Sequence, residues 1–230
     1  MSTRQDYITA IGNFVGGDLP LGETEKIVCI NRAVKRYSAD RPRLLVADMD
    51  GDGGFDYAIA GLTEWNEAFS SIKSVEYPVD DTKAAAAILQ EEVWQTYQKP
   101  AGKVLRFLED VPAANEDIRI TYTALHLCTD AQDTIPIVDA EAVQMLAAAL
   151  FCTMLATYYS QDQDSTIAAD SVDHKSKAGE YSRRAKAYRA EYFDHLKIKE
   201  GGVIPASVTR DQDKSASWGA DHMTHPRRRR

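Results

Sequence analysis

The stretch that decides the fold is Ala142-Val-Gln-Met-Leu-Ala-Ala-Ala-Leu-Phe-Cys-Thr-Met-Leu-Ala156, in which only Gln144 and Thr153 are polar. A helix that is apolar on almost every side cannot lie on the surface of a monomer. The stretch therefore predicts a helix that its own domain covers on one side and a neighbouring subunit covers on the other. The residues expected at that subunit interface are Leu146, Leu150 and Met154.

The apolar stretch does not predict a membrane span. Its longest uninterrupted apolar run covers residues 145–152, whereas a span needs about 20 apolar residues. Residues 1–7 are polar and no apolar core follows them, so no secretory signal is expected. We expect a soluble protein that is made and folded in the cytoplasm.

Helical periodicity extends to both sides of this stretch. Residues 3–14 and 23–37 carry apolar side chains at intervals of three and four, which predicts two N-terminal helices. The second should end at Arg41, because the residue before a proline avoids helical angles. Asp139 is the expected N-cap of the apolar helix, since it follows Ile135-Pro136.

A second long C-terminal helix is predicted over residues 176–199. Its apolar stripe consists of Tyr181, Ala185, Tyr188, Tyr192 and Leu196, and its basic residues off that stripe are Arg183, Arg184, Lys186 and Arg189. Such a tyrosine stripe is more typical of a core than of a ligand site, and such a basic face is more typical of a solvated surface than of a phosphate groove.

Between the predicted helices, apolar and polar residues alternate with a period of two. The predicted strands are residues 43–47, 55–60, 71–77, 93–98, 103–108 and 117–127, with one or two helical turns at 63–69. The fold class is therefore α+β, a helical core with an inserted antiparallel β lobe. We expect N-terminal helices at 1–42, a β-rich lobe at 43–138, a helical pair at 139–200 and an extended C-terminal arm at 201–230.

The composition and charge of the chain exclude some classes of function. The chain has 230 residues, of which 44% are hydrophobic and 27% charged, and a net charge of −8. That acidic balance argues against general nucleic-acid binding, which needs clustered basic residues against phosphate. The three cysteines, Cys29, Cys128 and Cys152, each lie in an apolar stretch outside any CxxC or Cys/His cluster, so we expect buried thiols.

One loop has the spacing of a cation site. Asp48-Met-Asp50-Gly-Asp52-Gly53-Gly-Phe-Asp56 places carboxylates at alternate positions around glycine, as Ca²⁺ sites do. Position 12, counted from Asp48, is Ile59, where an EF-hand has glutamate. The alternative is a plain hairpin turn, because Asp and Gly are the residues that such turns require. A bound calcium ion would have a structural role.

No catalytic constellation can be assembled. The chain has no GxGxxG motif or P-loop, and no Ser/His/Asp or Cys/His arrangement can be argued, so an enzyme is not expected. The tail carries His222 and His225 three residues apart, without a cluster that would complete a metal site. It also combines Trp218 with a basic end, Arg227, Arg228, Arg229 and Arg230. An aromatic residue beside a basic terminus suggests a segment that orders on a partner.

The order of these elements, and several short segments, resemble the head–tail adaptor (head completion) proteins of tailed bacteriophages. The segments are Asp52-Gly-Gly-Phe-Asp-Tyr-Ala-Ile, Ser74-Val-Glu-Tyr-Pro, Ile120-Thr-Tyr-Thr-Ala-Leu-His, Ile135-Pro, Asp164-Ser-Thr-Ile-Ala-Ala-Asp-Ser-Val-Asp-His-Lys-Ser-Lys, Ser207-Val-Thr-Arg-Asp and Thr224-His-Pro-Arg. They span residues 50–230 and form no catalytic signature.

The resemblance implies a structural virion protein of the neck. Such adaptors form rings, commonly of twelve subunits, under the portal, and DNA passes through the lumen without sequence-specific binding. The partners implied are the portal protein and a stopper or tail-terminator protein. The tail from Trp218 to Arg230 is the expected portal-binding arm. Two alternatives stay open: another neck role, as stopper or tail terminator, and a calcium-binding structural or adhesion module built on the Asp48–Asp56 loop.

Overall fold

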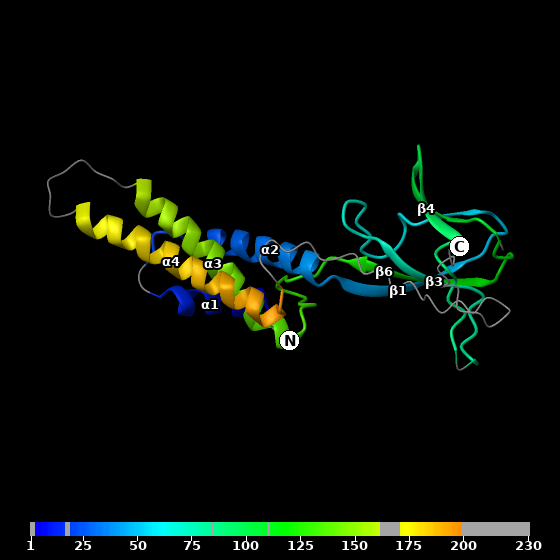
Figure 1. The fold of residues 1–230 in the computed structure, drawn as a ribbon, viewed down its shortest axis with the longest axis horizontal. Coiled ribbons are helices and arrows are strands. Elements are labelled where there is room, and N and C mark those ends of the chain that lie inside the picture. The colour runs from blue at the N-terminus through cyan, green and yellow to red at the C-terminus, as the bar shows by residue number, and fades with distance from the viewer. Residues whose placement is uncertain (1–2, 17–18, 84, 110, 162–170, 199–230) are drawn as a thin grey trace, which may run out of the picture. The chain divides into compact units, whose positions relative to one another are not determined.

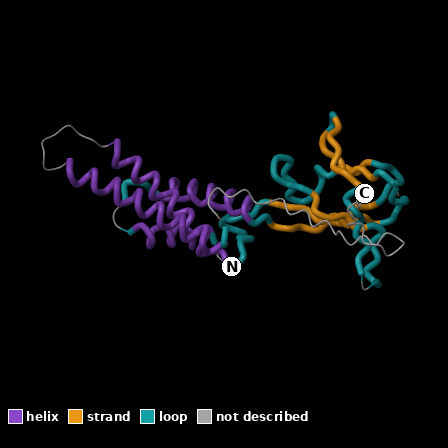
Figure 2. The backbone as a smooth tube through the Cα atoms, viewed as in Figure 1, coloured by secondary structure: helices purple, strands orange, loops and turns teal. Residues whose placement is uncertain are grey.

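The computed structural model describes residues 3–16, 19–83, 85–109, 111–161 and 171–198. The fold is α+β, and helices and strands gather in separate parts of it (Figure 2). The helices are α1 (Arg4–Val15), α2 (Glu23–Asp40), α3 (Ile137–Gln161) and α4 (Ser171–Leu196). The strands are β1 (Arg43–Asp50), β2 (Asp56–Ala58), β3 (Ile72–Glu76), β4 (Trp94–Lys99), β5 (Gly102–Phe107) and β6 (Asp117–Ala124).

The two N-terminal helices follow the sequence prediction closely. The first turn of α1 is fixed by Asp6, whose carboxylate accepts a hydrogen bond from the backbone N–H of Thr3 at 2.7 Å. Glu25 does the same for Gly22 at the start of α2, at 2.9 Å. Each acidic side chain satisfies a backbone donor that the helix leaves open. The C-terminal cap of α2 is Arg41, directly before Pro42, where the sequence predicts the end of this helix.

The apolar helix α3 is the centre of the helical core (Figure 1). It packs against α1, α2 and α4 of its own chain. An 18-residue window of α3 has a mean hydropathy of 1.5, which is apolar enough by length and composition to cross a membrane, and 56% of that window is buried inside the structure. The sequence prediction counted only uninterrupted apolar residues and missed this property. The packing of α3 is that of a core helix.

The three α3 residues expected at a subunit interface pack within the chain itself. Leu146 is 4% exposed within the core of the single chain. Leu150 and Met154 are half-buried and pack against that same core, and the Met154 sulfur lies 3.4 Å from that of Cys29. Three helices of the same chain therefore account for the burial of these residues, while Ile137, Val138 and Tyr158 of α3 stay exposed. A role of these residues in subunit contact stays a prediction.

The β lobe consists of two three-stranded antiparallel sheets, ordered β1-β6-β3 and β2-β5-β4. The predicted hairpin across the Asp/Gly loop is wrong, because β1 and β2 belong to different sheets. β1 instead pairs with β6 over its whole length, from Arg43 opposite Ala124 to Asp50 opposite Asp117. The expected helical turns at 63–69 are turns without helix.

The lobe has a hydrophobic core of its own. Alternation along β6 places Ile118, Ile120, Tyr122 and Ala124 on the inner side, each at most 1% exposed, as the period of two predicts. The first three join Val75, Leu105 and Phe107 in one cluster. The residues of this cluster are distinct from those of the helical core.

Candidate interaction surfaces

A buried carboxylate joins three helices. Asp139 lies in the first turn of α3 and is 3% exposed. Its Oδ2 accepts hydrogen bonds from the Tyr37 hydroxyl (2.6 Å) and Arg41 Nη1 (2.8 Å). Its Oδ1 lies 3.0 Å from Nε2 of His195 on α4. Asp139 is therefore not the helix cap that the sequence predicted, because α3 begins two residues earlier and the carboxylate points to α2 and α4.

The hydrogen-bond partners of Asp139 determine whether its carboxyl group is ionised. Burial by itself raises the pKa of a carboxyl group, and hydrogen bonds from Tyr37, His195 and Arg41 lower it. The lowering prevails, so the pKa of Asp139 lies below its ordinary value. Burial, together with the bond to Asp139, raises the pKa of the Tyr37 hydroxyl. Asp139 is thus an anion held inside the protein by three donors.

Further polar contacts surround this network. Asp40 Oδ2 accepts hydrogen bonds from Tyr192 on α4 (2.7 Å) and from Arg36 one turn earlier (2.9 Å). His126, after β6, lies 3.0 Å from the Arg41 carbonyl oxygen, and its backbone N–H donates to Ser38 at 2.9 Å. These contacts join α2 to α4 and to the chain that leaves the β lobe. Their geometry is that of a structural network.

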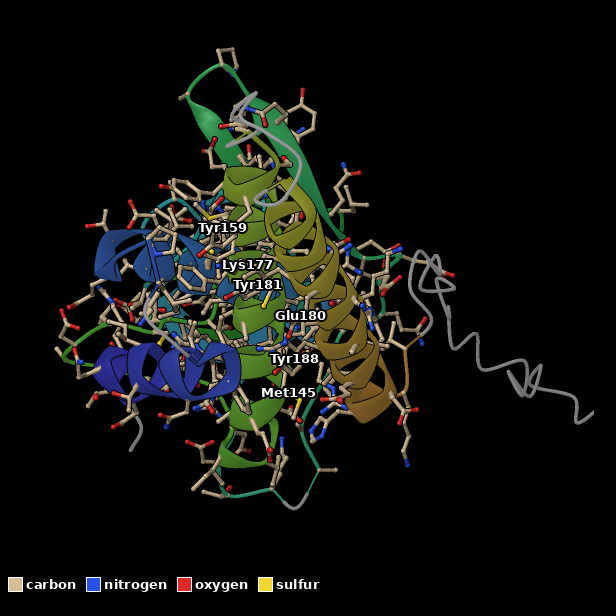
Figure 3. The ribbon with its side chains drawn as sticks, turned by 90° about the vertical axis from the view of Figure 1, so that its left-hand side faces the viewer. Met145, Tyr159, Lys177, Glu180, Tyr181 and Tyr188 are labelled. Atoms are coloured by element: carbon tan, nitrogen blue, oxygen red, sulfur yellow. The ribbon has the colours of Figure 1, made fainter. Side chains whose placement is uncertain are left out.

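The seam between α3 and α4 carries the predicted tyrosine stripe (Figure 3). Tyr159 and Tyr181 stack with ring centroids 5.7 Å apart, and the Lys177 ammonium lies 5.7 Å from the Tyr159 ring centroid. Tyr188 donates its hydroxyl to the Phe14 carbonyl oxygen at 2.8 Å. The stripe therefore packs within the chain, which confirms the interpretation as core. Of the basic residues, Arg184 is half-buried and donates to the Val15 carbonyl oxygen at 2.9 Å.

The aspartates of the proposed calcium loop separate in the structure. Asp48 on β1 pairs with Arg119, at 2.8 and 3.0 Å. Asp56 on β2 pairs with Arg106, at 2.6 and 2.9 Å, and these contacts hold the pKa of Asp56 far below its ordinary value. The Asp52 carboxylate accepts the N–H of Gly54 at 2.7 Å.

No group of three or more His, Cys, Asp or Glu side chains among the described residues could hold a metal ion. A cation bound by Asp48, Asp50, Asp52 and Asp56 together would have to displace two guanidinium groups. Calcium binding stays a prediction from the sequence.

The glycine between these aspartates has a packing role. Gly51 is buried, and a Cβ atom there would lie 2.3 Å from the Ala113 carbonyl oxygen and 2.8 Å from that of Glu116. The Gly51 N–H donates to Glu116 at 2.8 Å, and its carbonyl oxygen accepts from Asn115 at 3.0 Å. Only glycine permits this approach of two backbones. The loop is therefore held against residues 112–116.

The outward row of β1 carries two exposed apolar side chains. Leu44 and Val46 on β1 are 57% and 59% exposed. The alternate residues Leu45, Ala47 and Met49 pack against the core of the lobe. The sequence held the signal, because Leu44-Leu-Val-Ala is apolar on both parities of a strand, and one face of an edge strand must then be exposed or covered by a partner.

The remaining predicted residues divide into two groups. The three cysteines are free and at most 5% exposed, which confirms the prediction of buried thiols. Burial raises the pKa of Cys29 and Cys152 to about 11 and that of Cys128 to about 12. The predicted portal-binding residues Trp218, His222, His225 and Arg227, Arg228, Arg229 and Arg230 lie outside the described residues.

Comparison with known proteins gives no family. No protein-family model matches the chain, and no curated protein matches it significantly. Among solved structures, the chain is similar to one described as the neck of an empty GTA particle computed with C6 symmetry, with 13% identity, a TM-score of 0.29, and coverage of 76% of this chain and 90% of that chain. It is also similar to one described as the neck of a native GTA particle computed with C12 symmetry, with 12% identity, a TM-score of 0.27, and coverage of 68% and 80%. Superpositions at these TM-scores do not establish a common fold.

Proposed function

We propose that this protein is a head–tail adaptor, a structural protein that forms a ring between the portal and the tail of a phage-like particle. Twelve copies of the chain would surround a lumen through which DNA passes without sequence-specific contact. The partners would be the portal protein on one side and a stopper or tail-terminator protein on the other. The site of action is the neck of the virion, and the role is assembly.

The observation that carries the proposal is a difference in burial between the helical core and the β lobe. The helical core covers α3 and satisfies its buried carboxylate with its own side chains. The β lobe instead leaves Leu44 and Val46 exposed on a regular sheet. A self-sufficient core that carries an uncovered apolar surface suits a protein that acts by association. The element order and sequence segments that resemble phage adaptors give that association its setting.

Light scattering of the full chain, alone and mixed with the portal protein of the same particle, tests the proposal. The expected result is a complex with the mass of a portal ring plus about one copy of this chain per portal subunit. A mixture in which both proteins keep their separate masses would contradict the portal-binding role. The protein mixed with its stopper protein then tests the alternative neck positions.

A deletion tests the predicted arm separately. A chain that lacks residues 203–230 retains every described element, so it should fold and fail to join the portal. A second variant replaces only Arg227 to Arg230 by serine, which keeps Trp218; weaker portal binding of this variant would assign part of the anchor to the basic end. Normal binding of the truncated chain to the portal would show that the arm is not the anchor.

A further inference from the structure

The long edge strand β1 is open on one side. In its sheet, β1 lies beside β6 alone (Figure 1), in eight consecutive pairs without a bulge. At the opposite edge, β3 is covered, because Leu89 donates to the Val75 carbonyl oxygen (2.8 Å) and Tyr77 donates to that of Ala87 (3.0 Å). Among the described residues, no backbone group hydrogen-bonds to the free side of β1.

The first half of β1 also lacks the lysine, proline or bulge that protects many free edges. Proteins commonly place lysine, proline or a bulge on such strands, because an open regular edge pairs with other strands. β1 reads Arg-Leu-Leu-Val-Ala-Asp-Met-Asp, with neither lysine nor proline. Its only cationic side chain, Arg43, pairs with Glu64. The outward row of β1 is therefore apolar at Leu44 and Val46.

The other end of that outward row is acidic and uncompensated. Asp50 on β1 lies directly opposite Asp117 on β6. Both are exposed, and neither has a cationic partner among the described residues. Like charges in directly opposed positions destabilise a sheet. Asp48, two residues earlier, is by contrast neutralised by Arg119. A positive charge beside Asp50 would relieve the repulsion that Asp50 and Asp117 exert on each other.

We propose that β1 binds an extended segment of a partner protein by strand addition. The free backbone edge would supply the hydrogen bonds, which are independent of sequence. Specificity would come from apolar side chains of the segment beside Leu44 and Val46, and from an arginine or lysine beside Asp50. The six-residue interval from Leu44 to Asp50 corresponds to roughly 20 Å of extended chain, so the segment needs seven residues. This inference concerns a way of binding and does not depend on the identity of the neck partner.

Peptide binding to the full chain tests the proposal. The probe is a blocked nonapeptide in which Ile, Val, Arg and Arg alternate with Thr, synthesised in both chain directions because strand addition can be parallel or antiparallel. Saturable binding of one direction in calorimetry is expected, with amide shifts in NMR spectra concentrated on residues 43–50. A control peptide that carries Asp in place of both Arg residues should bind about fivefold more weakly or worse.

Two substitutions locate the site. Asp50→Arg should weaken binding of the arginine peptide about fivefold and strengthen binding of the aspartate peptide, a reversal that a folding defect would not produce. Val46→Lys should abolish binding of both peptides. The matched control Ala58→Lys changes an exposed strand residue in the other sheet and should leave binding unchanged.

Three results would overturn the proposal. The first is no binding of either peptide direction to a chain with a native circular dichroism spectrum. The second is peptide binding that Val46→Lys leaves intact. The third is self-association of the wild-type chain in sedimentation that Val46→Lys abolishes while the peptides fail to bind, because the occupant of β1 would then be a second copy of this chain.

Discussion

The helical core and the β lobe treat their buried polar groups differently. In the helical core, the anion of Asp139 receives a partner from each of Tyr37, Arg41 and His195. By contrast, Nε of Arg43 and the indole nitrogens of Trp65 and Trp94 are buried without a hydrogen-bond partner among the described residues, and all three belong to the lobe. Buried polar groups are normally paired. The helical core is therefore the more completely satisfied of the two.

The helical core and the β lobe also differ in how they expose apolar side chains. The outward row of β1 combines exposed apolar side chains with an open edge, whereas α3 packs most of its central part against three helices of its own chain and exposes Ile137, Val138 and Tyr158 near its ends. This difference suggests that the helices supply stability and that the lobe supplies recognition. Mutations in each region can test that division.

Removal of a core ring should have the largest effect on stability. Phe151 on α3 is fully buried, and truncation of such a ring leaves a cavity. Phe151→Ala should therefore lower the free energy of unfolding by about 3–5 kcal/mol, measured by urea denaturation followed at 222 nm. The exposed Val28 on α2 is the control, and Val28→Ala should change it by about 0.5 kcal/mol or less.

The same truncation in the lobe tests whether the two cores are separate. Phe107 is 1% exposed in the core of the lobe. Phe107→Ala should weaken amide protection on β1, β3 and β6 in native-state hydrogen exchange more than on α3. Equal loss of protection in both regions would mean that the helices and the lobe unfold as one cooperative unit, and the comparison would fail.

Loss of the buried Asp139 anion should have the next largest effect on the free energy of unfolding. Asp139→Asn keeps the shape of the side chain but removes its charge, and leaves Arg41 without its counter-ion. We expect a loss of about 2–4 kcal/mol, read from the same urea curves. Asp194→Asn, in the last turn of α4 and exposed, is the matched control. A loss no larger than that of the control would show that the network adds no stability.

The pH dependence of that loss follows from the direction of the pKa shift. The folded-state pKa of Asp139 is below its ordinary value, and the pKa of an aspartate in the unfolded chain is about 3.9. The stabilisation is therefore fully present above that value and disappears as the pH falls through the lower folded-state pKa. The difference in Tm between wild type and Asp139→Asn should be large at pH 7 and shrink below pH 4. A difference that stays constant to low pH would contradict an ionised Asp139.

The smallest effect is expected at the thiols. Cys29, Cys128 and Cys152 are buried with raised pKa values, and the thiolate is the reactive form. At pH 8 the native chain should show almost no reaction with Ellman's reagent, while the denatured chain releases three equivalents. Rapid reaction of one thiol in the native chain would reveal local opening around it.

The sequence predicted the elements that depend on local periodicity. Alternation along β6 and the three-to-four spacing in α1 and α2 both reflect one buried face, so they can be read from neighbouring residues. The pairing of the strands could not be read in this way. The Asp/Gly loop has the chemistry of a hairpin, yet β1 pairs with β6, about seventy to eighty residues further along the chain. Local turn signals do not report which distant strand competes for an edge.

The same limit applies to the candidate sites. The local context of Asp139 predicts a helix cap, whereas its partners Tyr37 and His195 lie 102 and 56 residues away. The apolar character of α3 predicts a second covering surface, but a sequence does not show how many helices of the same chain will pack against that helix. The outward row of β1 was visible in Leu44-Leu-Val-Ala, but its exposure depends on which side of the sheet the lobe fills.

The Asp139 network also has a consequence for how such a chain can evolve. Tyr37 and Arg41 lie at the end of α2 and Asp139 at the start of α3, so their bonds join the two points between which the whole β lobe is inserted. A host fold whose insertion points are tied together tolerates exchange of the inserted module, because the entropy of closing the loop grows only slowly with its length. Recombination could therefore replace the lobe by one that recognises another partner while the helical host stays unchanged.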